Sequence, residues 1–305
     1  LSTCTTGSNN TALGYQTLLG NTASSNTAIG YRAMATNTSG SFNTACGISA
    51  LSTNSTGSFN TAVGHQALNV NTTDSNTAVG YQALLGNTSG GNNTAIGNSA
   101  LITNTSGGFN VGIGSLALQS NTSGNQNIGV GYTALGSNTT GFSNTAVGYG
   151  TLGFNTTGGR NIAIGNNSLL KNTTLNDNVA VGESALNSNT GATNVAIGAS
   201  ALRVKGSGDG NVAIGYLANE VISSVRNSIA IGTQTVAGGT GSIALGAGST
   251  AAFANSAAIG NATICSAANK IRLGNAAVTV IEGQVAYTFT SDRRIKNNIT
   301  ENIVG

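Results

Sequence analysis

The chain has few side chains that could act as acids, bases, nucleophiles or metal ligands. Only 6% of its 305 residues are charged, and it contains a single histidine, His65. One histidine cannot supply a repeated metal site, and a calcium-binding repeat needs an aspartate in each unit. Residues 112–117 fit a dinucleotide fingerprint, but no helix pattern follows them. The sequence therefore predicts no metal, no cofactor and no active site within its main body.

A stripe of aromatic side chains at regular spacing is the first candidate binding surface. Such rings could stack on sugars or contact a protein receptor, because tyrosine offers rigid amphipathic contact area. They could equally shield the strand edges between coils. The residues of this aromatic stripe each follow a glycine directly, and they are Tyr15, Tyr31, His65, Tyr81, Tyr132 and Tyr149.

The glycines in front of these rings anchor a repeat that runs through almost the whole chain. Seventeen copies align on this glycine, with 16 or 17 residues between copies up to Gly232 and 14 for the last three steps. A period this short and persistent indicates a solenoid. Dense β-branched residues without helical spacing favour strands. The expected fold class is all-β, a parallel β-solenoid.

The apolar columns of the repeat predict how each coil is built. The residue before the anchor glycine is apolar in every copy, and we expect it to point inward with its neighbour two positions earlier half-buried. Cys46 occupies this column, so its thiol should be buried. A Leu or Met four residues after the glycine has the wrong parity for the same strand face. We therefore expect a glycine corner followed by a second short strand.

Asparagine fills two further columns, one lying four residues before the anchor glycine and one seven residues after it. Stacked asparagines can hydrogen-bond along the axis of a parallel solenoid, so we predict two structural ladders. Many asparagines of the second column form glycosylation sequons, but coils about 4.8 Å apart leave no room for a glycan on each. The predicted ladder residues include Asn43, Asn60, Asn76 and Asn93 in the first column and Asn54, Asn71, Asn87 and Asn104 in the second.

One such coil cannot be stable alone, because it buries few aliphatic side chains against the entropy of ordering 17 residues. Columns of small residues, such as Ala62 and Ala67, would let another backbone approach closely. We therefore expect an oligomer packed side by side. A net charge of +3 with scattered basic residues does not indicate a nucleic-acid partner, and no apolar run is long enough for membrane insertion in this segment.

Residues 211–275 resemble the head repeats of trimeric autotransporter adhesins. The resemblance rests on units such as Asn227-Ser228-Ile229-Ala230-Ile231-Gly232 and extends more loosely to the 16- and 17-residue copies. Those heads form a left-handed parallel β-roll packed as a homotrimer, so the resemblance implies the same handedness and assembly here. The expected domains are a solenoid at 1–207, adhesin-like coils at 208–275 and a non-repeating β-strand connector at 276–290.

Residues 291–305 resemble the start of the endosialidase-type intramolecular chaperone of phage tailspikes and tail fibres. That domain trimerises, guides folding of the fibre and cuts itself off at its first serine. The resemblance implies that Ser291 is the nucleophile of this autocleavage and Asp292 its neighbour at the cut. About fifteen residues of the domain are present. The matching residues are Ser291, Asp292, Arg294, Lys296, Asn298 and Ile299.

These features predict an extracellular trimeric fibre or adhesin shaft, on a virion or a cell surface, that presents or provides receptor binding. The partners expected are two further copies of the chain and a glycan or protein receptor. Two alternatives stay open: an ice-binding solenoid whose flat threonine or asparagine arrays order water, and a self-cleaving tailspike-type protein.

Overall fold

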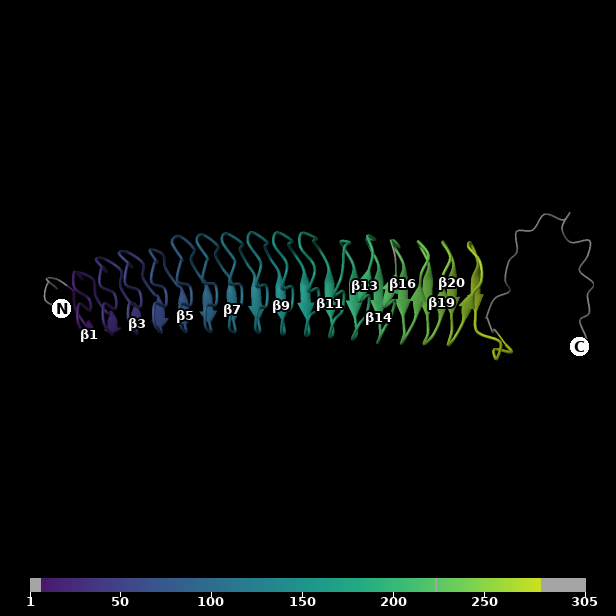
Figure 1. The fold of residues 1–305 in the computed structure, drawn as a ribbon, viewed down its shortest axis with the longest axis horizontal. Coiled ribbons are helices and arrows are strands. Elements are labelled where there is room, and N and C mark those ends of the chain that lie inside the picture. The colour runs from purple at the N-terminus through teal and green to yellow at the C-terminus, as the bar shows by residue number, and fades with distance from the viewer. Residues whose placement is uncertain (1–6, 223, 281–305) are drawn as a thin grey trace, which may run out of the picture.

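The computed structural model describes residues 7–222 and 224–280, and this part of the chain is a β-solenoid (Figure 1). Its coils lie side by side along one long axis, in chain order from the N-terminus to the C-terminus. The described residues contain strands and turns and no helix. None of them can therefore form a membrane-spanning helix. The predicted fold class, an all-β parallel β-solenoid, is confirmed.

One short strand from each coil contributes to a 17-stranded parallel sheet. Each strand pairs in register with the strand of the next coil, so Thr27 lies beside Thr44 and Ala28 beside Ala45. This register places the residues of each sequence column next to one another. The strands are β1 (Thr11–Leu13), β2 (Thr27–Ile29), β3 (Thr44–Cys46), β4 (Thr61–Val63), β5 (Thr77–Val79), β6 (Thr94–Ile96), β7 (Val111–Ile113), β8 (Ile128–Val130), β9 (Thr145–Val147), β10 (Ile162–Ile164), β11 (Val179–Val181), β12 (Val195–Ile197), β14 (Val212–Ile214), β16 (Ile229–Ile231), β18 (Ile243–Leu245), β20 (Ala257–Ile259) and β22 (Ile271–Leu273).

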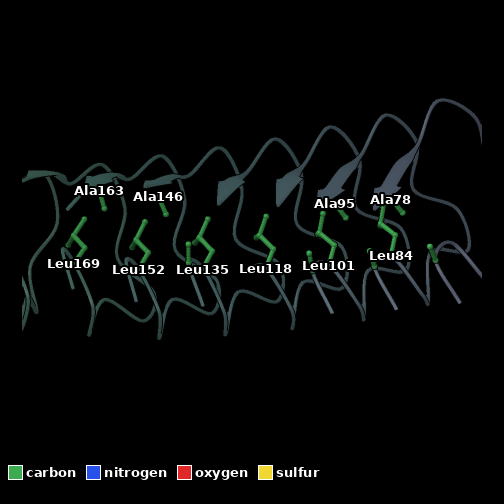
Figure 2. Close-up of a cluster of buried hydrophobic side chains, with 14 of the residues drawn as sticks. Ala78, Leu84, Ala95, Leu101, Leu118, Leu135, Ala146, Leu152, Ala163 and Leu169 are labelled. Atoms are coloured by element: carbon green, nitrogen blue, oxygen red, sulfur yellow. The ribbon is translucent and has the colours of Figure 1, made fainter. Parts of the chain in front are cut away.

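The core of the 16- and 17-residue coils is an alanine column packed against a leucine column. The central residue of each strand points inward, for example Ala95 and Ala163, and both are fully buried. Opposite them lie the leucines four residues after the anchor glycine, such as Leu101 and Leu169 (Figure 2). The two columns form one continuous cluster along the solenoid.

The predicted inward direction of the residue before the glycine is therefore wrong. Ile96 and Ile164 point outward, and Cys46 is exposed for the same reason. The leucine from the opposite wall already fills the coil, and only a small residue fits beneath it. A Cβ added to Gly112, which replaces alanine in one coil, would lie 3.3 Å from the Cδ1 of Leu101. A Val or Ile at that inward position would overpack the core.

We had expected the alanine columns to face a neighbouring chain, and this prediction is wrong. Ala62 and Ala67 are fully buried inside their own coil. They allow the two walls of one coil to approach each other, so any side-by-side contact between chains must use another surface.

The segment between the anchor glycine and the buried leucine is a turn, so the second strand that we predicted to end near that leucine is wrong. Leu101, for example, has a φ of 51°, which lies in the left-handed region and is incompatible with a pleated strand. Second strands occur only farther along the described chain. They form a two-stranded and a three-stranded parallel sheet: β13 (Val204–Lys205) with β15 (Val221–Ile222), and β17 (Val236–Ala237), β19 (Thr250–Ala251) and β21 (Ile264–Cys265).

The 14-residue coils, which begin at β16, have a narrower core. Ala244 of the sheet strand and Ala251 of the second strand are both buried, so alanine replaces leucine on the second wall. Asn219 occupies the leucine position at the change of width. Its Oδ1 accepts a hydrogen bond of 2.7 Å from the backbone N–H of Ala237. This buried amide connects the last wide coil to the first narrow one.

Candidate functional site

The outer surface of the 17-stranded sheet is the longest regular surface of the described chain. We call the first and third residues of its strands the strand face. No charged residue stands on it in any of these strands. In β10 both residues are isoleucines, Ile162 and Ile164, and they are 42% and 41% exposed. The structure thus leaves a continuous stripe of β-branched side chains facing outward.

Threonine supplies one column of the strand face near the N-terminus. Thr61 and Thr77 point outward beside Val63 and Val79 in adjacent coils. From β7 onward Val or Ile replaces threonine in most strands. The flat threonine array that an ice-binding surface would need is therefore confined to the first coils, and the strand face as a whole is apolar.

The second asparagine column forms a chain of side-chain hydrogen bonds through the wide coils. The Nδ2 of Asn104 donates to the Oδ1 of Asn87 at 2.8 Å, and the Nδ2 of Asn121 donates to the Oδ1 of Asn104 at 2.8 Å. Asn104 also donates to the carbonyl of Gly107 at 2.9 Å, which closes the turn of its own coil. These amides are fully buried, so a folded coil leaves no space for a glycan at their sequons. The chain of bonds ends where the Oδ1 of Asn172 has no partner.

The first asparagine column connects the coils through the backbone. The Oδ1 of Asn76 accepts a hydrogen bond from the backbone N–H of Asn93 at 3.0 Å. The Nδ2 of Asn93 donates to the carbonyl of Gly107, in the turn of the following coil, at 2.8 Å. Asn43 and Asn60 are arranged in the same way. Both asparagine columns therefore bond each coil to its neighbours, and neither presents its amides to a partner.

The aromatic stripe lies at the corner after the strand, and its rings are exposed. The structure brings them together in pairs of parallel rings. Centroids are 5.8 Å apart for Tyr15 and Tyr31, 5.5 Å for His65 and Tyr81, and 5.4 Å for Tyr132 and Tyr149. Non-aromatic residues separate the pairs. The stripe is thus three separate aromatic platforms rather than one continuous surface.

The sequence patterns did not indicate a fourth aromatic pair or a charged pair. Phe42 and Phe59 stack with centroids 5.1 Å apart. Arg160 donates to both carboxylate oxygens of Asp177 and lies over the ring of Phe142. The hydrogen bond from Arg160 lowers the pKa of the Asp177 carboxyl, and the same bond raises the pKa of the arginine. Both side chains are solvent-exposed, so this pair contributes little to stability.

The predicted autocleavage residues, Ser291 and Asp292, lie outside the described residues. Within the described part of the chain, no group of three or more His, Cys, Asp or Glu residues could hold a metal ion. The described surface offers exposed aromatic rings for stacking and an apolar strand face for burial against a partner.

Comparison with known proteins supports one of the two resemblances. A family model described as the YadA head domain repeat matches two copies, at residues 226–249 and 237–263. Residues 226–263, which lie in the narrow coils, are thus similar to YadA head repeats. The matched residues include β16 to β20, in which two short strands and two small inward residues build each coil. No curated protein matches the chain. The resemblance of residues 291–305 to a chaperone stays a prediction.

Proposed function

We propose that this chain is the shaft of a homotrimeric, adhesin-like fibre, exposed on a virion or a cell, that presents or provides receptor binding. The observation that carries the proposal is the strand face, an outward apolar stripe along all 17 strands. Contiguous apolar surface on this scale marks an interaction site in a soluble protein. The occupant that fits a straight stripe of the same length is the same stripe of another copy.

A threefold arrangement is supported by the YadA head repeats at residues 226–263. The strand face runs through these coils and continues without a charged residue into the wide coils. A common interface can therefore extend from β1 to β22. The handedness of the β-roll, which the adhesin resemblance implies as left-handed, belongs to the same proposal.

Replacing Ile162 and Ile164 with lysine should convert the assembly to monomers. Both side chains are outward in the single chain, so the lysines cost the isolated coil little, but buried in an interface they would be unpaired charges. Wild-type protein should sediment with the mass of three chains, and the double variant should weaken association at least tenfold. Analytical ultracentrifugation over a dilution series measures both.

Phe109→Arg is the matched control. Phe109 is exposed outside the strand face, and Arg160 occupies the equivalent position of a later coil with the same φ of 58°. This variant should keep the mass of three chains. A wild-type monomer or dimer, or a double variant that still sediments as a trimer, would contradict the proposal.

We also propose that Ser291 is the site at which a complete C-terminal chaperone separates from the fibre. The support is the motif of residues 291–299. Expressed with a complete chaperone domain, the wild-type chain should yield a fibre that ends at Thr290, whereas Ser291→Ala should stay uncut. Intact mass spectrometry distinguishes the two products. A wild-type chain that keeps its full mass would contradict cleavage at this serine.

A further inference from the structure

A surface hollow of about 230 Å³ lies on the wall opposite the strand face. Its lining includes three glycines from two neighbouring coils, Gly136, Gly150 and Gly153. Leu135 and Leu152 come from the same stretches of chain, and their side chains point the other way, toward the strands (Figure 2). The hollow is therefore accessible on a side that the proposed trimer contact does not use.

The hollow exists because three side chains are missing at positions that other coils fill. Gly136 and Gly153 stand in the column that holds Gln119 and Leu170 in the coils on either side. Gly150 has a φ of 62°, and the residues before and after it in its column, Thr133 and Asn167, have φ values of 52° and 55°. The backbone thus accepts a side chain at this corner in adjacent coils. Adjacent coils fold with side chains in both of these columns, so the three glycines together shape the surface of these two coils.

The lining of the hollow combines apolar and polar side chains. Phe154, which is 53% exposed, and Leu170 line it, and none of the lining residues is charged. Gln119, Thr133 and Ser137 also line it. The carbonyl of Gly153 already accepts a hydrogen bond of 3.0 Å from the backbone N–H of Ser137. The polar side chains of the lining offer further hydrogen-bonding groups to a ligand.

The polar side chains of the lining, Gln119, Thr133 and Ser137, can form further hydrogen bonds. The Oγ1 of Thr133 donates to the carbonyl of Tyr132 at 2.8 Å and keeps its lone pairs as acceptors. In the described part of the chain, the side chains of Gln119 and Ser137 make no hydrogen bond to another protein group. An amide and two hydroxyls around an aromatic wall can match the hydroxyl groups of a ring that has one apolar face.

We infer that this hollow binds a single neutral hexopyranose ring of a surface glycan, which deepens the adhesive function proposed above and rests on it. The C–H face of a sugar can pack on the ring of Phe154, while its hydroxyls bond to Gln119, Thr133 and Ser137. The absence of charge in the lining disfavours an acidic sugar. The hollow is smaller than the roughly 300–1,000 Å³ of pockets for drug-sized ligands, so it holds one ring.

The nearest aromatic platform supports the same ligand class. Tyr132 and Tyr149 stack in parallel, and each directly precedes a residue of the hollow, Thr133 and Gly150. Tyr149 is 56% exposed. A glycan held in the hollow by one sugar could place the next on this platform, which single-ring probes would not report.

Saturation-transfer difference NMR on the intact chain tests the inference, with the methyl glycosides of glucose, galactose and mannose as probes at millimolar concentration. Saturation should reach the ring C–H protons of at least one probe. Phe154→Thr and Gly136→Gln should each reduce the signal at least fivefold. Both substitutions introduce residues that other coils carry in the same columns, Thr103 and Gln119, so the coils should still fold. Phe109→Ser, which removes an exposed aromatic ring elsewhere, should leave the signal unchanged.

Three results would overturn the inference: no transfer to any of the three sugars, equal transfer in both hollow variants and wild type, or displacement of the probe by sialyllactose more readily than by neutral lactose. Sedimentation of the same samples separates this proposal from the trimer. If the chain is a trimer but binds no sugar, only the proposed glycan site is contradicted. If the chain is a monomer but binds sugar through Phe154, the proposed trimer is contradicted and the glycan site is supported.

Discussion

Replacing Gly97 with alanine is expected to prevent the coils on either side from stacking, at a cost of more than about 3 kcal/mol in the free energy of unfolding. Gly97 has a φ of 137°, which L-residues with a side chain rarely adopt. A Cβ there would lie 2.5 Å from the carbonyl oxygen of Gly114 in the next coil. That oxygen belongs to backbone, so it can move away only if the coils separate.

The effect should be local first, because each coil of a solenoid contacts mainly its neighbours. Hydrogen exchange read by mass spectrometry should show lost protection in β6 and β7, and limited proteolysis should cut between residues 97 and 114. Gly20→Ala is the matched control, since an added Cβ there meets nothing within 4 Å. If the free energy of unfolding of the Gly97→Ala chain lies within about 0.5 kcal/mol of the wild-type value, close backbone contact at the anchor glycines does not fix the spacing of the coils.

The sequence was sufficient to predict the solenoid because the same residue types recur at the same positions from copy to copy. Glycine at the corner and alanine in the strand recur at fixed spacing, and each tolerates almost no replacement in the space it occupies. The same spacing predicted a turn after the strand, and the structure places one there.

The face of each strand that points into the core could not be predicted, because either face was consistent with the usual pattern of buried and exposed residues. An apolar Ile96 normally indicates a core position, whereas Ala95 is acceptable on either side. The decision depends on Leu101, which reaches the same interior from the opposite wall. The distance between the two walls of a coil depends on how the whole coil closes, and the sequence pattern of the strand does not contain it. The outward apolar residues then become informative, since a chain with few charges keeps one before the anchor glycine in every coil.

The hollow was also invisible in the sequence. Gly136 and Gly153 share one column, but Gly150 belongs to another and Phe154 to a third. Their convergence follows from how neighbouring coils stack, and each residue read alone is an ordinary substitution in a polar turn. The pairing of Tyr132 with Tyr149, by contrast, follows from one column and an uninterrupted register.

Asn104→Ala should lower the free energy of unfolding by about 2–4 kcal/mol. The substitution removes the two hydrogen bonds that Asn104 donates and the one it accepts from Asn121. It leaves the Oδ1 of Asn87 buried with no bond from the next coil, and unmet buried polar groups cost roughly 1–3 kcal/mol each. Denaturant unfolding followed by circular dichroism, compared at equal protein concentration, measures the change.

Asn98→Ser is the matched control, because Asn98 is exposed and Ser115 fills its column in the next coil. Its free energy of unfolding should stay within about 0.5 kcal/mol of the wild-type value, as expected for surface positions. A loss from Asn104→Ala no larger than that of the control would mean that water replaces the missing amide. Such a result would mean that the buried amides follow from the stacking of the coils and do not stabilise it. The close packing at glycine and alanine would then be what holds the coils together. A large loss would show that the coils are held by their polar interior as well as by the thin apolar core of Ala95 and Leu101.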